Sequence, residues 1–320
     1  MPDGAIGIDI GGSFIKAGLV STKGELLRKL SIKTRQDVNT IVQTVRHLVG
    51  QLELEAPQFD IQVKSVGIGS CGVVDSCSGV ILQSVAIPGY DGTGLKALLE
   101  DHLAYPFVVE NDVNAAAWAE LQVRDSLEIA DFLHVAVGTG IGCGVILERR
   151  IWHGSSYCAG EIGHITVDRN GPMCSCGNIG CLELYASTAG VINYAVEAIK
   201  GGRASIISQL VADDLQKVTI PIIAEAEKAG DEVATQAFAN AGRNCGIGLT
   251  TLANLFDPQV ISVGGGIVDA SSTFFREAKR FVEKRALMPV RANLIIDLGR
   301  LGRAAGVIGA ALLSLEEIGS

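Results

Sequence analysis

Apolar residues along this chain occur as short continuous runs and as helically spaced positions, and the two patterns alternate. Residues 5–20 read as an apolar run, a glycine turn at Gly11–Ser13 and a second apolar run, which predicts two strands joined by a hairpin. Residues 132–147 repeat this plan around Gly138–Gly140. The weak duplication predicts two domains that each open with a glycine-tipped hairpin.

Helical spacing of apolar positions predicts a helix over Asp37–Leu54 and one long helix over Asp231–Phe256. The pattern also predicts a short helix at Leu95–Leu103 and a closing helix at Arg303–Leu315. Buried strands are predicted at Val63–Ile68, Phe107–Val109 and Val260–Val263. Strands that alternate with helices indicate an α/β fold, in which ligands bind at the ends of strands.

Composition and charge exclude several classes of protein. The 320 residues carry a formal charge of −9 and show no basic stripe, which argues against a nucleic-acid binder. The first residues lack the basic start and the long apolar core that are typical of a signal peptide, and no run of about 18 apolar residues predicts a membrane span. We therefore expect a cytoplasmic protein without a membrane or nucleic-acid partner, in which clustered cysteines are more often metal ligands than disulfides.

Three glycine-rich turns are candidates for phosphate binding. Backbone N–H groups at Gly11–Ser13 can approach phosphate oxygens closely, and Asp9 at the strand end can hold a hydrated Mg²⁺. The alternative is a plain hairpin turn beside a surface acid. Gly138–Gly140, with a hydroxyl between two glycines, and Gly264–Gly266 after an apolar strand favour the phosphate interpretation, although either could be an ordinary turn.

Asn111 and Asp112 stand where a predicted strand ends and an alanine-rich helix begins. From position alone, a helix N-cap is the favoured interpretation, because Asn and Asp are common caps. A carboxylate at such a strand end can also accept a proton from a substrate hydroxyl. We expect the helix N-terminus to keep Asp112 ionised, as a base requires.

One histidine and three cysteines lie within eighteen residues, at His164, Cys174, Cys176 and Cys181. This set is typical of a closed, structural zinc site, and the alternative is three free cysteines beside an unrelated histidine. Glu161 and Glu183 flank the cluster and could accept hydrogen bonds from sugar hydroxyls, unless they are simply solvated. The other cysteines are predicted to be small core residues, and the other histidines to be surface or packing residues; they are Cys71, Cys77, Cys143, Cys158, Cys245, His47, His102, His134 and His153.

Together, these motifs resemble those of the ROK family of sugar kinases and sugar-responsive repressors. The resemblance covers essentially the whole chain, with Ser13 where threonine is commoner and Cys71 in place of a proline. The segment Ala86–Tyr90 lacks the asparagine and tryptophan of the family pattern. The similar segments read DIGGSFIK, GIGSCGVVD, ENDVNAAA, VGTGIGCGV, GEIGH, CSCGNIGCLE and VISVGGG.

The resemblance implies a two-lobed actin-like ATPase fold, of the ribonuclease-H-like type, with a central cleft. The implied small lobe comprises residues 1–111 and 300–320, and the large lobe comprises 112–299 with the zinc loop. ATP and Mg²⁺ are implied cofactors, with Asp9 holding the Mg²⁺ through water. The implied ATP contacts are Asp9, Gly11, Gly12, Ser13, Lys16, Gly138, Thr139, Gly140, Gly264, Gly265 and Gly266.

For the sugar, the resemblance implies Asp112 as the base on the 6-hydroxyl. Contacts to the sugar are implied for Gly72, Asn111, Asp112, Glu161, His164 and Glu183, and zinc ligation for His164, Cys174, Cys176 and Cys181. Through one ring nitrogen His164 would bind zinc, and through the other it could meet the sugar. A homodimer is also implied.

Family members divide into kinases and repressors, and a repressor would need a helix-turn-helix domain before the first glycine motif. Because few residues precede that motif here, we expect an ATP-dependent hexokinase, with glucose as the favoured substrate. N-acetylmannosamine, N-acetylglucosamine, fructose and mannose remain alternative substrates, and polyphosphate an alternative donor. A sugar sensor without catalysis is the alternative of a different class.

Overall fold

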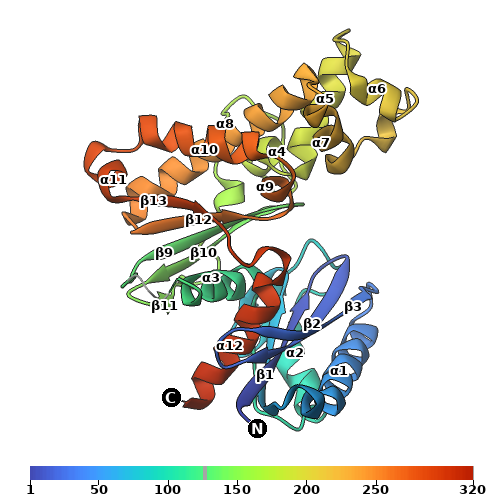
Figure 1. Ribbon diagram of the computed structural model, residues 1–320, viewed down its shortest axis with the longest axis vertical. Helices are drawn as coiled ribbons and strands as arrows, with labels where there is room; N and C mark the ends of the chain where they lie inside the picture. Colours follow the sequence, from blue (N-terminus) through green and yellow to red (C-terminus); the bar gives the residue numbers. More distant parts are fainter. Residues whose placement is uncertain (125–127, 320) are drawn as a thin grey trace. The chain divides into compact units, whose positions relative to one another are not determined.

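The computed structural model describes residues 1–124 and 128–319. Its strands form two five-stranded mixed sheets and one small three-stranded sheet, with helices around them (Figure 1). Among the helices of this described part, none combines the length and the apolar composition needed to cross a membrane. The α/β class predicted from the alternating pattern is confirmed.

The first sheet has the strand order β3-β2-β1-β4-β8. Strand β1 runs antiparallel to β2 but parallel to β4, and β4 is parallel to β8. The carboxyl ends of three parallel strands therefore meet, with Ile10 opposite Ser70 and Ser70 opposite Asn111. The strands are β1 (Asp3–Ile10), β2 (Phe14–Ser21), β3 (Leu26–Lys33), β4 (Gln62–Ser70) and β8 (Phe107–Asn111), and the small sheet holds β5 (Val73–Asp75), β6 (Val80–Gln83) and β7 (Thr93–Gly94).

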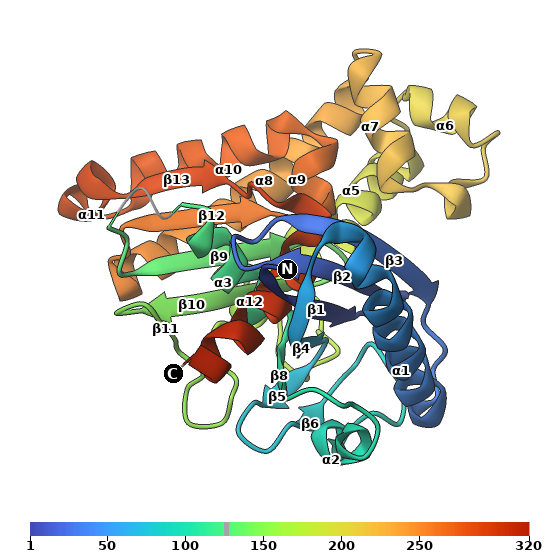
Figure 2. The same cartoon turned by 60° about the horizontal axis from the view of Figure 1, so that its bottom comes forward.

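Helices cover both faces of the first sheet (Figures 1 and 2). On one face, Ile6, Ile8 and Ile10 pack with the apolar side of α1 in a single core cluster. On the other face α12 approaches so closely that a Cβ atom at Gly67 would lie 1.7 Å from the carbonyl oxygen of Ala310. The helices of this region are α1 (Val38–Glu55), α2 (Leu95–Glu100), α3 (Asp112–Gln122) and α12 (Ala305–Gly319).

The second sheet has the order β11-β10-β9-β12-β13, and β12 is parallel to both β9 and β13. Its strands are β9 (Phe132–Val137), β10 (Ile141–Leu147), β11 (Arg150–Ile151), β12 (Val260–Gly264) and β13 (Ile295–Leu298). The helices between β11 and α12 are α4 (Glu183–Ala186), α5 (Thr188–Lys200), α6 (Ile206–Leu210), α7 (Ile220–Lys228), α8 (Glu232–Phe256), α9 (Gly266–Ala270), α10 (Ser272–Arg285) and α11 (Met288–Asn293).

The predicted helices and strands are largely confirmed, with small differences at their ends. The side chains of Asp37 and Asp231 cap α1 and α8 by accepting backbone N–H hydrogen bonds. Helix α2 ends at Glu100, before the predicted Leu103, because the chain turns at residues 101–102, where the His102 N–H donates to the Leu99 carbonyl at 2.9 Å. Helix α12 begins at Ala305, after a short 3₁₀ turn.

The described chain divides into two compact units. The first unit contains residues 1–130, 144–160 and 303–320, and the second contains residues 131–143 and 161–302. The lobes predicted from the resemblance, 1–111 with 300–320 and 112–299, stay a prediction. Residues 125–127 and Ser320, which fall within those lobes, lie outside the described residues.

Candidate functional site

In the first unit, the ends of the parallel strands bring together four of the predicted side chains. Asp9 lies at the end of β1, is buried, and accepts a hydrogen bond from Lys16 at 2.7 Å. The pairing register places Lys16 on β2 directly opposite Asp9. Asn111 ends β8 and Asp112 begins α3. The sequence did not predict that Lys16 and Asp9 would be paired with each other.

Asn111 is the N-cap of α3, as its position predicted. Its side-chain oxygen accepts hydrogen bonds from the N–H groups of Val113 and Asn114, each at 2.9 Å. Its amide nitrogen donates to the carbonyl oxygen of Gly72 at 2.9 Å and to Asp112 Oδ1 at 3.2 Å. Gly72 has a φ of +103°, a conformation that glycine adopts without strain. Asn111 thus joins the loop at Gly72 to the start of α3.

The carboxyl group of Asp112 has an unusual protonation equilibrium. Burial and the negative charge of Asp9 raise its pKa to about 7, against the opposing effects of the Val113 N–H and Lys16. The helix N-terminus favours ionisation of Asp112, as expected, but desolvation outweighs the amide hydrogen bond and leaves the carboxyl group only partly ionised at neutral pH. A carboxyl group with a pKa near 7 is well matched to proton transfer at neutral pH.

Glu110 and His153 form a hydrogen-bonded pair that the sequence did not predict. Glu110, only 6% exposed, accepts a hydrogen bond from His153 Nε2 at 2.7 Å. Its other carboxylate oxygen accepts from the Asn111 N–H at 2.8 Å and from Asn114 Nδ2 at 3.0 Å. The hydrogen bond to Glu110 raises the pKa of His153, despite partial burial. The pair thereby supports the segment that carries Asn111 and Asp112.

The first glycine turn leaves backbone donors available for a ligand. The Gly11 N–H donates to the Phe14 carbonyl at 3.1 Å, and the Gly11 carbonyl accepts from the Thr34 hydroxyl at 2.6 Å. The N–H groups of Gly12 and Ser13 have no protein acceptor within the described residues. Two free N–H groups on a short turn are suited to bind a phosphate oxygen.

In the second unit, the second and third glycine loops lie side by side. Strands β9 and β12 are parallel, with Gly264 opposite Ala136. At Gly265, where φ is +108°, a Cβ atom would lie 2.3 Å from the Val137 carbonyl oxygen, so any side chain would collide with the strand that leads into the second loop. The Gly138 N–H donates to the Gly140 carbonyl at 2.9 Å and closes that loop. Both loops therefore follow the carboxyl ends of two adjacent strands, and Thr139 and Gly140 are exposed there.

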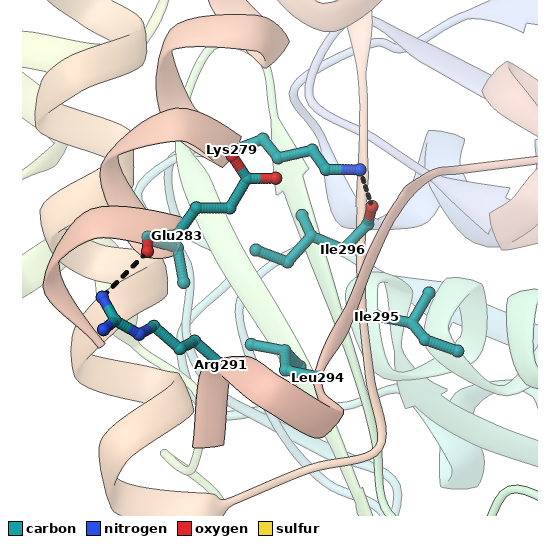
Figure 3. Close-up of a pocket in the computed structure, with 7 residues that line it drawn as sticks. Lys279, Glu283, Arg291, Leu294, Ile295 and Ile296 are labelled. Atoms are coloured by element: carbon teal, nitrogen blue, oxygen red, sulfur yellow. Dashed lines mark hydrogen bonds between the residues drawn. The ribbon is translucent and has the colours of Figure 1, made fainter. Parts of the chain in front are cut away.

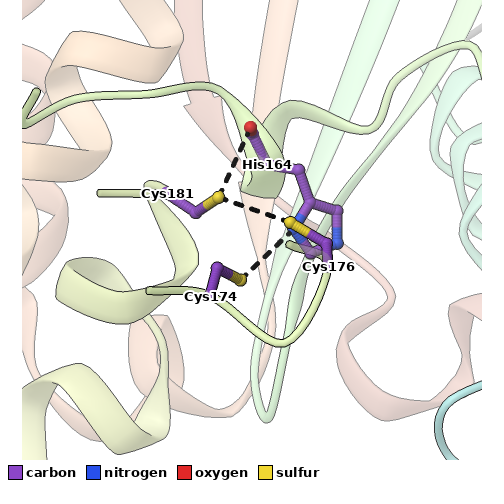
Figure 4. A group of neighbouring side chains, drawn as sticks. All are labelled: His164, Cys174, Cys176 and Cys181. Carbon is purple, nitrogen blue, oxygen red and sulfur yellow. Dashed lines mark hydrogen bonds between the residues drawn. The ribbon is translucent and has the colours of Figure 1, made fainter. Parts of the chain in front are cut away.

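The four predicted metal ligands converge in the second unit (Figure 4). One ligand atom from each lies within 4.8 Å of all the others. Cys176 Sγ is 3.6 Å from Cys181 Sγ, and Cys174 Sγ is 3.8 Å from His164 Nδ1. Tetrahedral zinc with bonds of about 2.1–2.3 Å requires ligand atoms roughly 3.4–3.8 Å apart. These two distances match such an ion, and all four ligand atoms lie close enough together to surround one.

Hydrogen bonding prepares the metal loop for an ion. Burial opposes ionisation of Cys174, but donors from Cys176, Cys181 and His164 lower its pKa to about 7. Burial raises the pKa of Cys181 to about 12. One thiolate is thus available near neutral pH, and a bound metal would favour deprotonation of the others.

The two glutamates beside the metal loop have different surroundings. Glu183 Oε2 accepts a hydrogen bond from the Ile141 N–H at 3.1 Å, directly after the second glycine loop. Glu161 is partly exposed, with its carboxylate 4.0 Å from His164 Nε2. Burial raises the pKa of Glu161, opposed by His164 and reinforced by Glu183. Glu183 is therefore not simply solvated, whereas Glu161 is exposed and the alternative that the sequence left open still applies to it.

The remaining cysteines and histidines follow the predictions only in part. Cys143 and Cys245 are buried and Cys71 is half-buried, but Cys77 and Cys158 are exposed, so the prediction that all five are core residues is wrong for those two. His47 and His102 are exposed, and His134 is buried beside Ser262. The predicted Ala86–Tyr90 segment contributes Tyr90 to the core at 0% exposure, with its hydroxyl group accepting from Ser70.

A cavity of about 300 Å³ lies elsewhere in the second unit, among α10, α11 and β13 (Figure 3). Its basic side chains are engaged by the protein, since Lys279 donates to the Ile296 carbonyl and Arg291 to the Glu283 carbonyl. None of its lining residues was predicted to bind substrate.

Known proteins resemble the chain over almost its whole length. The model of the ROK family matches residues 5–317. A glucokinase of Halalkalibacterium halodurans is 31% identical over 98% of this chain and 95% of its own length, and a xylose repressor of Caldicellulosiruptor bescii is 26% identical over 98% and 78%. The crystal structure of a ROK family glucokinase from Streptomyces griseus, in complex with glucose and AMPPNP, superposes with a TM-score of 0.84 at 32% identity, covering 98% of this chain and 99% of that one. The chain, with its paired glycine hairpins and its histidine–cysteine cluster, belongs to the ROK family.

Proposed function

We propose that this protein transfers the terminal phosphoryl group of ATP to the 6-hydroxyl group of a hexose, with glucose as the preferred acceptor. The observation that carries the proposal is the state of Asp112, a half-buried acid at a strand end whose pKa is raised to about 7. Such a group can accept a proton at neutral pH, as a base on a substrate alcohol must. The glucokinase relatives support the choice of sugar.

In the proposed reaction, Asp112 accepts the proton of the 6-hydroxyl group. The sugar oxygen forms a bond to the γ-phosphorus, the bond from that phosphorus to the bridging oxygen breaks, and ADP leaves with the electron pair. Because the transition state of phosphoryl transfer is loose, proton transfer can be late and a weak base suffices. Asn111 would orient Asp112, to which its amide donates at 3.2 Å.

The nucleotide would be held by backbone rather than by long side chains. The free N–H groups of Gly12 and Ser13, and the second loop around Thr139, are the proposed phosphate donors. Asp9 would hold Mg²⁺ through water, and the Mg²⁺ would neutralise charge on the phosphates. Lys16, paired with Asp9 at 2.7 Å, would balance the buried carboxylate when no cation is bound.

For the sugar, we propose that Gly72, Asn111, Glu161, His164 and Glu183 accept from or donate to its other hydroxyl groups. A structural zinc ion bound by the histidine–cysteine cluster would fix the loop between Glu161 and Glu183. His164 offers Nδ1 to the cluster, which leaves Nε2 free to contact a hydroxyl group.

A sugar sensor without catalysis is the second candidate, favoured by the xylose repressors among the relatives. ADP release with glucose and Mg-ATP separates the two functions. A kinase gives one ADP for each glucose 6-phosphate, whereas a sensor binds the sugar in calorimetry but releases no ADP. A panel of glucose, mannose, fructose and the two N-acetylhexosamines, ranked by kcat/KM, would then identify the acceptor.

A further inference from the structure

The metal loop is fastened to the second glycine hairpin at both of its ends. Before the loop, Gly163 lies so close to the hairpin that a Cβ atom there would be 2.4 Å from the Ile141 carbonyl oxygen. After the loop, Glu183 Oε2 accepts the Ile141 N–H at 3.1 Å. The backbone of Ile141 therefore lies between the two flanks of the metal loop.

The hairpin is held at its other end by the same segment. The Thr188 N–H, at the start of α5, donates to the Gly138 carbonyl at 2.8 Å. Glu183 also fills the space beside Gly140, where a Cβ atom would lie 2.7 Å from its Oε2. Residues 183–188 thus contact both ends of the hairpin, Gly138 and Ile141. Within the described residues, the N–H groups of Thr139 and Gly140 donate to no protein acceptor.

The same segment is joined to the metal ligands. Cys181 is fully buried and stands two residues before Glu183. Leu182 is also buried, and its N–H donates to the Ile165 carbonyl at 2.9 Å, next to the ligand His164. A displacement of Cys181 would therefore move Glu183, because only Leu182 separates them and the Leu182 N–H is itself bonded to the residue that follows His164.

We propose that Glu183 is a positioning residue. When the histidine–cysteine cluster is ordered by its metal, Glu183 keeps the Gly138–Gly140 hairpin in a fixed position. Loss of the metal then loosens the hairpin, and not only the loop that contains the ligands. Because the hairpin is a phosphate-binding loop only if the proposed function is right, the expected weakening of nucleotide binding rests on that function. The loosening itself does not.

The amide of Ile141 reports this contact directly, without nucleotide or turnover. We expect hydrogen exchange at Ile141 to become at least ~10-fold faster in Glu183→Ala than in the unmodified, zinc-loaded protein. Glu183→Gln keeps an oxygen acceptor and should restore slow exchange. Glu161→Ala is the matched control, since Glu161 also flanks the metal loop but, in the described part of the chain, makes no hydrogen bond to the hairpin. The amide of Ile261, in the central strand β12, serves as the internal reference.

Zinc removal tests the transmission itself. After chelation, verified by elemental analysis, Ile141 should exchange at least ~10-fold faster while Ile261 keeps its protection. ADP affinity, measured by calorimetry, should weaken ~10-fold or more in both the zinc-free protein and Glu183→Ala, on the scale expected when binding groups are misplaced.

Unchanged exchange at Ile141 in Glu183→Ala would overturn the inference. So would exchange at Ile141 that stays slow after zinc has left. If chelation instead exposes Ile261 as well, the metal stabilises the whole unit rather than the hairpin, and local transmission from the metal is overturned. Failure of the unmodified protein to bind ADP would contradict the proposed function, and the exchange comparison would still decide whether Glu183 positions the hairpin.

Discussion

In the first unit the candidate groups are mainly polar side chains near the ends of parallel strands, beside one glycine turn, whereas in the second unit they are mainly backbone atoms of glycine loops beside a sulfur cluster. The first arrangement depends on burial and neighbouring charge, which raise the pKa of Asp112 to about 7. The second depends on close packing. Neighbouring backbone approaches closely at Gly163 and Gly265, and the Glu183 carboxylate accepts the Ile141 N–H.

This difference separates reactivity from binding. A change to a charged group in the first unit alters the free energy of a proton transfer and should appear in kcat. A change to the metal loop alters the position of donors that act equally on bound substrate and transition state, and should appear in KM and Kd. Substitutions in the first unit should therefore change mainly kcat, whereas substitutions of similar size in the metal loop should change mainly KM and Kd.

The largest effect is expected for Asp112→Asn. Removing the base should lower kcat by at least ~10²-fold, because an amide cannot accept the proton from the sugar hydroxyl. Glucose affinity, measured by calorimetry, should stay nearly intact. Asp101→Asn, an exposed site outside the candidate site, is the matched control. Turnover at the wild-type level would remove Asp112 from the mechanism.

The same variant should also be more stable than the wild type at pH 8. The pKa of Asp112 is raised by folding, so its contribution to stability is complete below about 3.8 and is lost as the pH rises through about 7. An amide is neutral at every pH and avoids this loss. A higher Tm at pH 8, with little difference at pH 4, would show that the lost turnover does not come from misfolding.

In the second unit, Cys176→Ala should release the metal and weaken binding. Cys176 is the exposed ligand, so the change leaves no buried cavity. We expect elemental analysis to find zinc in the wild type but not in the variant, and glucose affinity to fall up to ~10²-fold through misplaced contacts. Cys158→Ala, another exposed cysteine, should retain both. A wild-type protein that contains no metal would contradict the zinc assignment.

The sequence predicted features that depend on neighbouring residues and missed contacts between residues far apart in the chain. Helices α1 and α8 follow from apolar spacing with an aspartate at the start, and the four metal ligands follow from their spacing in one segment. The Glu110–His153 contact joins residues separated by 43 positions, so no local pattern could indicate it. The raised pKa of Asp112 depends in the same way on the distant Asp9.

The local sequence pattern also could not predict whether a single small residue is buried or exposed. Cys77 and Cys158 have no periodic neighbours that would place them inside or outside, and both proved to be exposed. Tyr90 differs from the family pattern in a segment expected near the sugar, yet it is fully buried. Its replacement of tryptophan is therefore a change in core packing.

A smaller effect is expected from pH. With Mg-ATP held below its KM, kcat/KM reports the free enzyme, and it should fall about tenfold for each pH unit below the pKa of Asp112, near 7. Above that pH it should level off, because the base is already deprotonated. A profile that is flat from pH 5 to 9 would show that Asp112 does not control the rate through its ionisation.

The smallest expected effect concerns His153, which is hydrogen-bonded to Glu110, two residues before the candidate base Asp112. Its pKa is raised by the hydrogen bond to Glu110, so the stabilisation by protonated His153 is complete below about 6.5 and is lost as the pH rises through the folded-state value. Ser76 Oγ, the Tyr157 ring and the charge of Asp75 are its other neighbours.

We therefore expect His153→Gln to lower Tm by ~2–4 °C at pH 6 and by less at pH 9, where the wild type has already lost the charge. Differential scanning calorimetry at the two pH values measures this change. His102→Gln, at an exposed histidine, should give the same small difference at both. If His153→Gln lowered Tm equally at pH 6 and pH 9, the contact with Glu110 would act as a neutral hydrogen bond, and the charge of His153 would not contribute to stability.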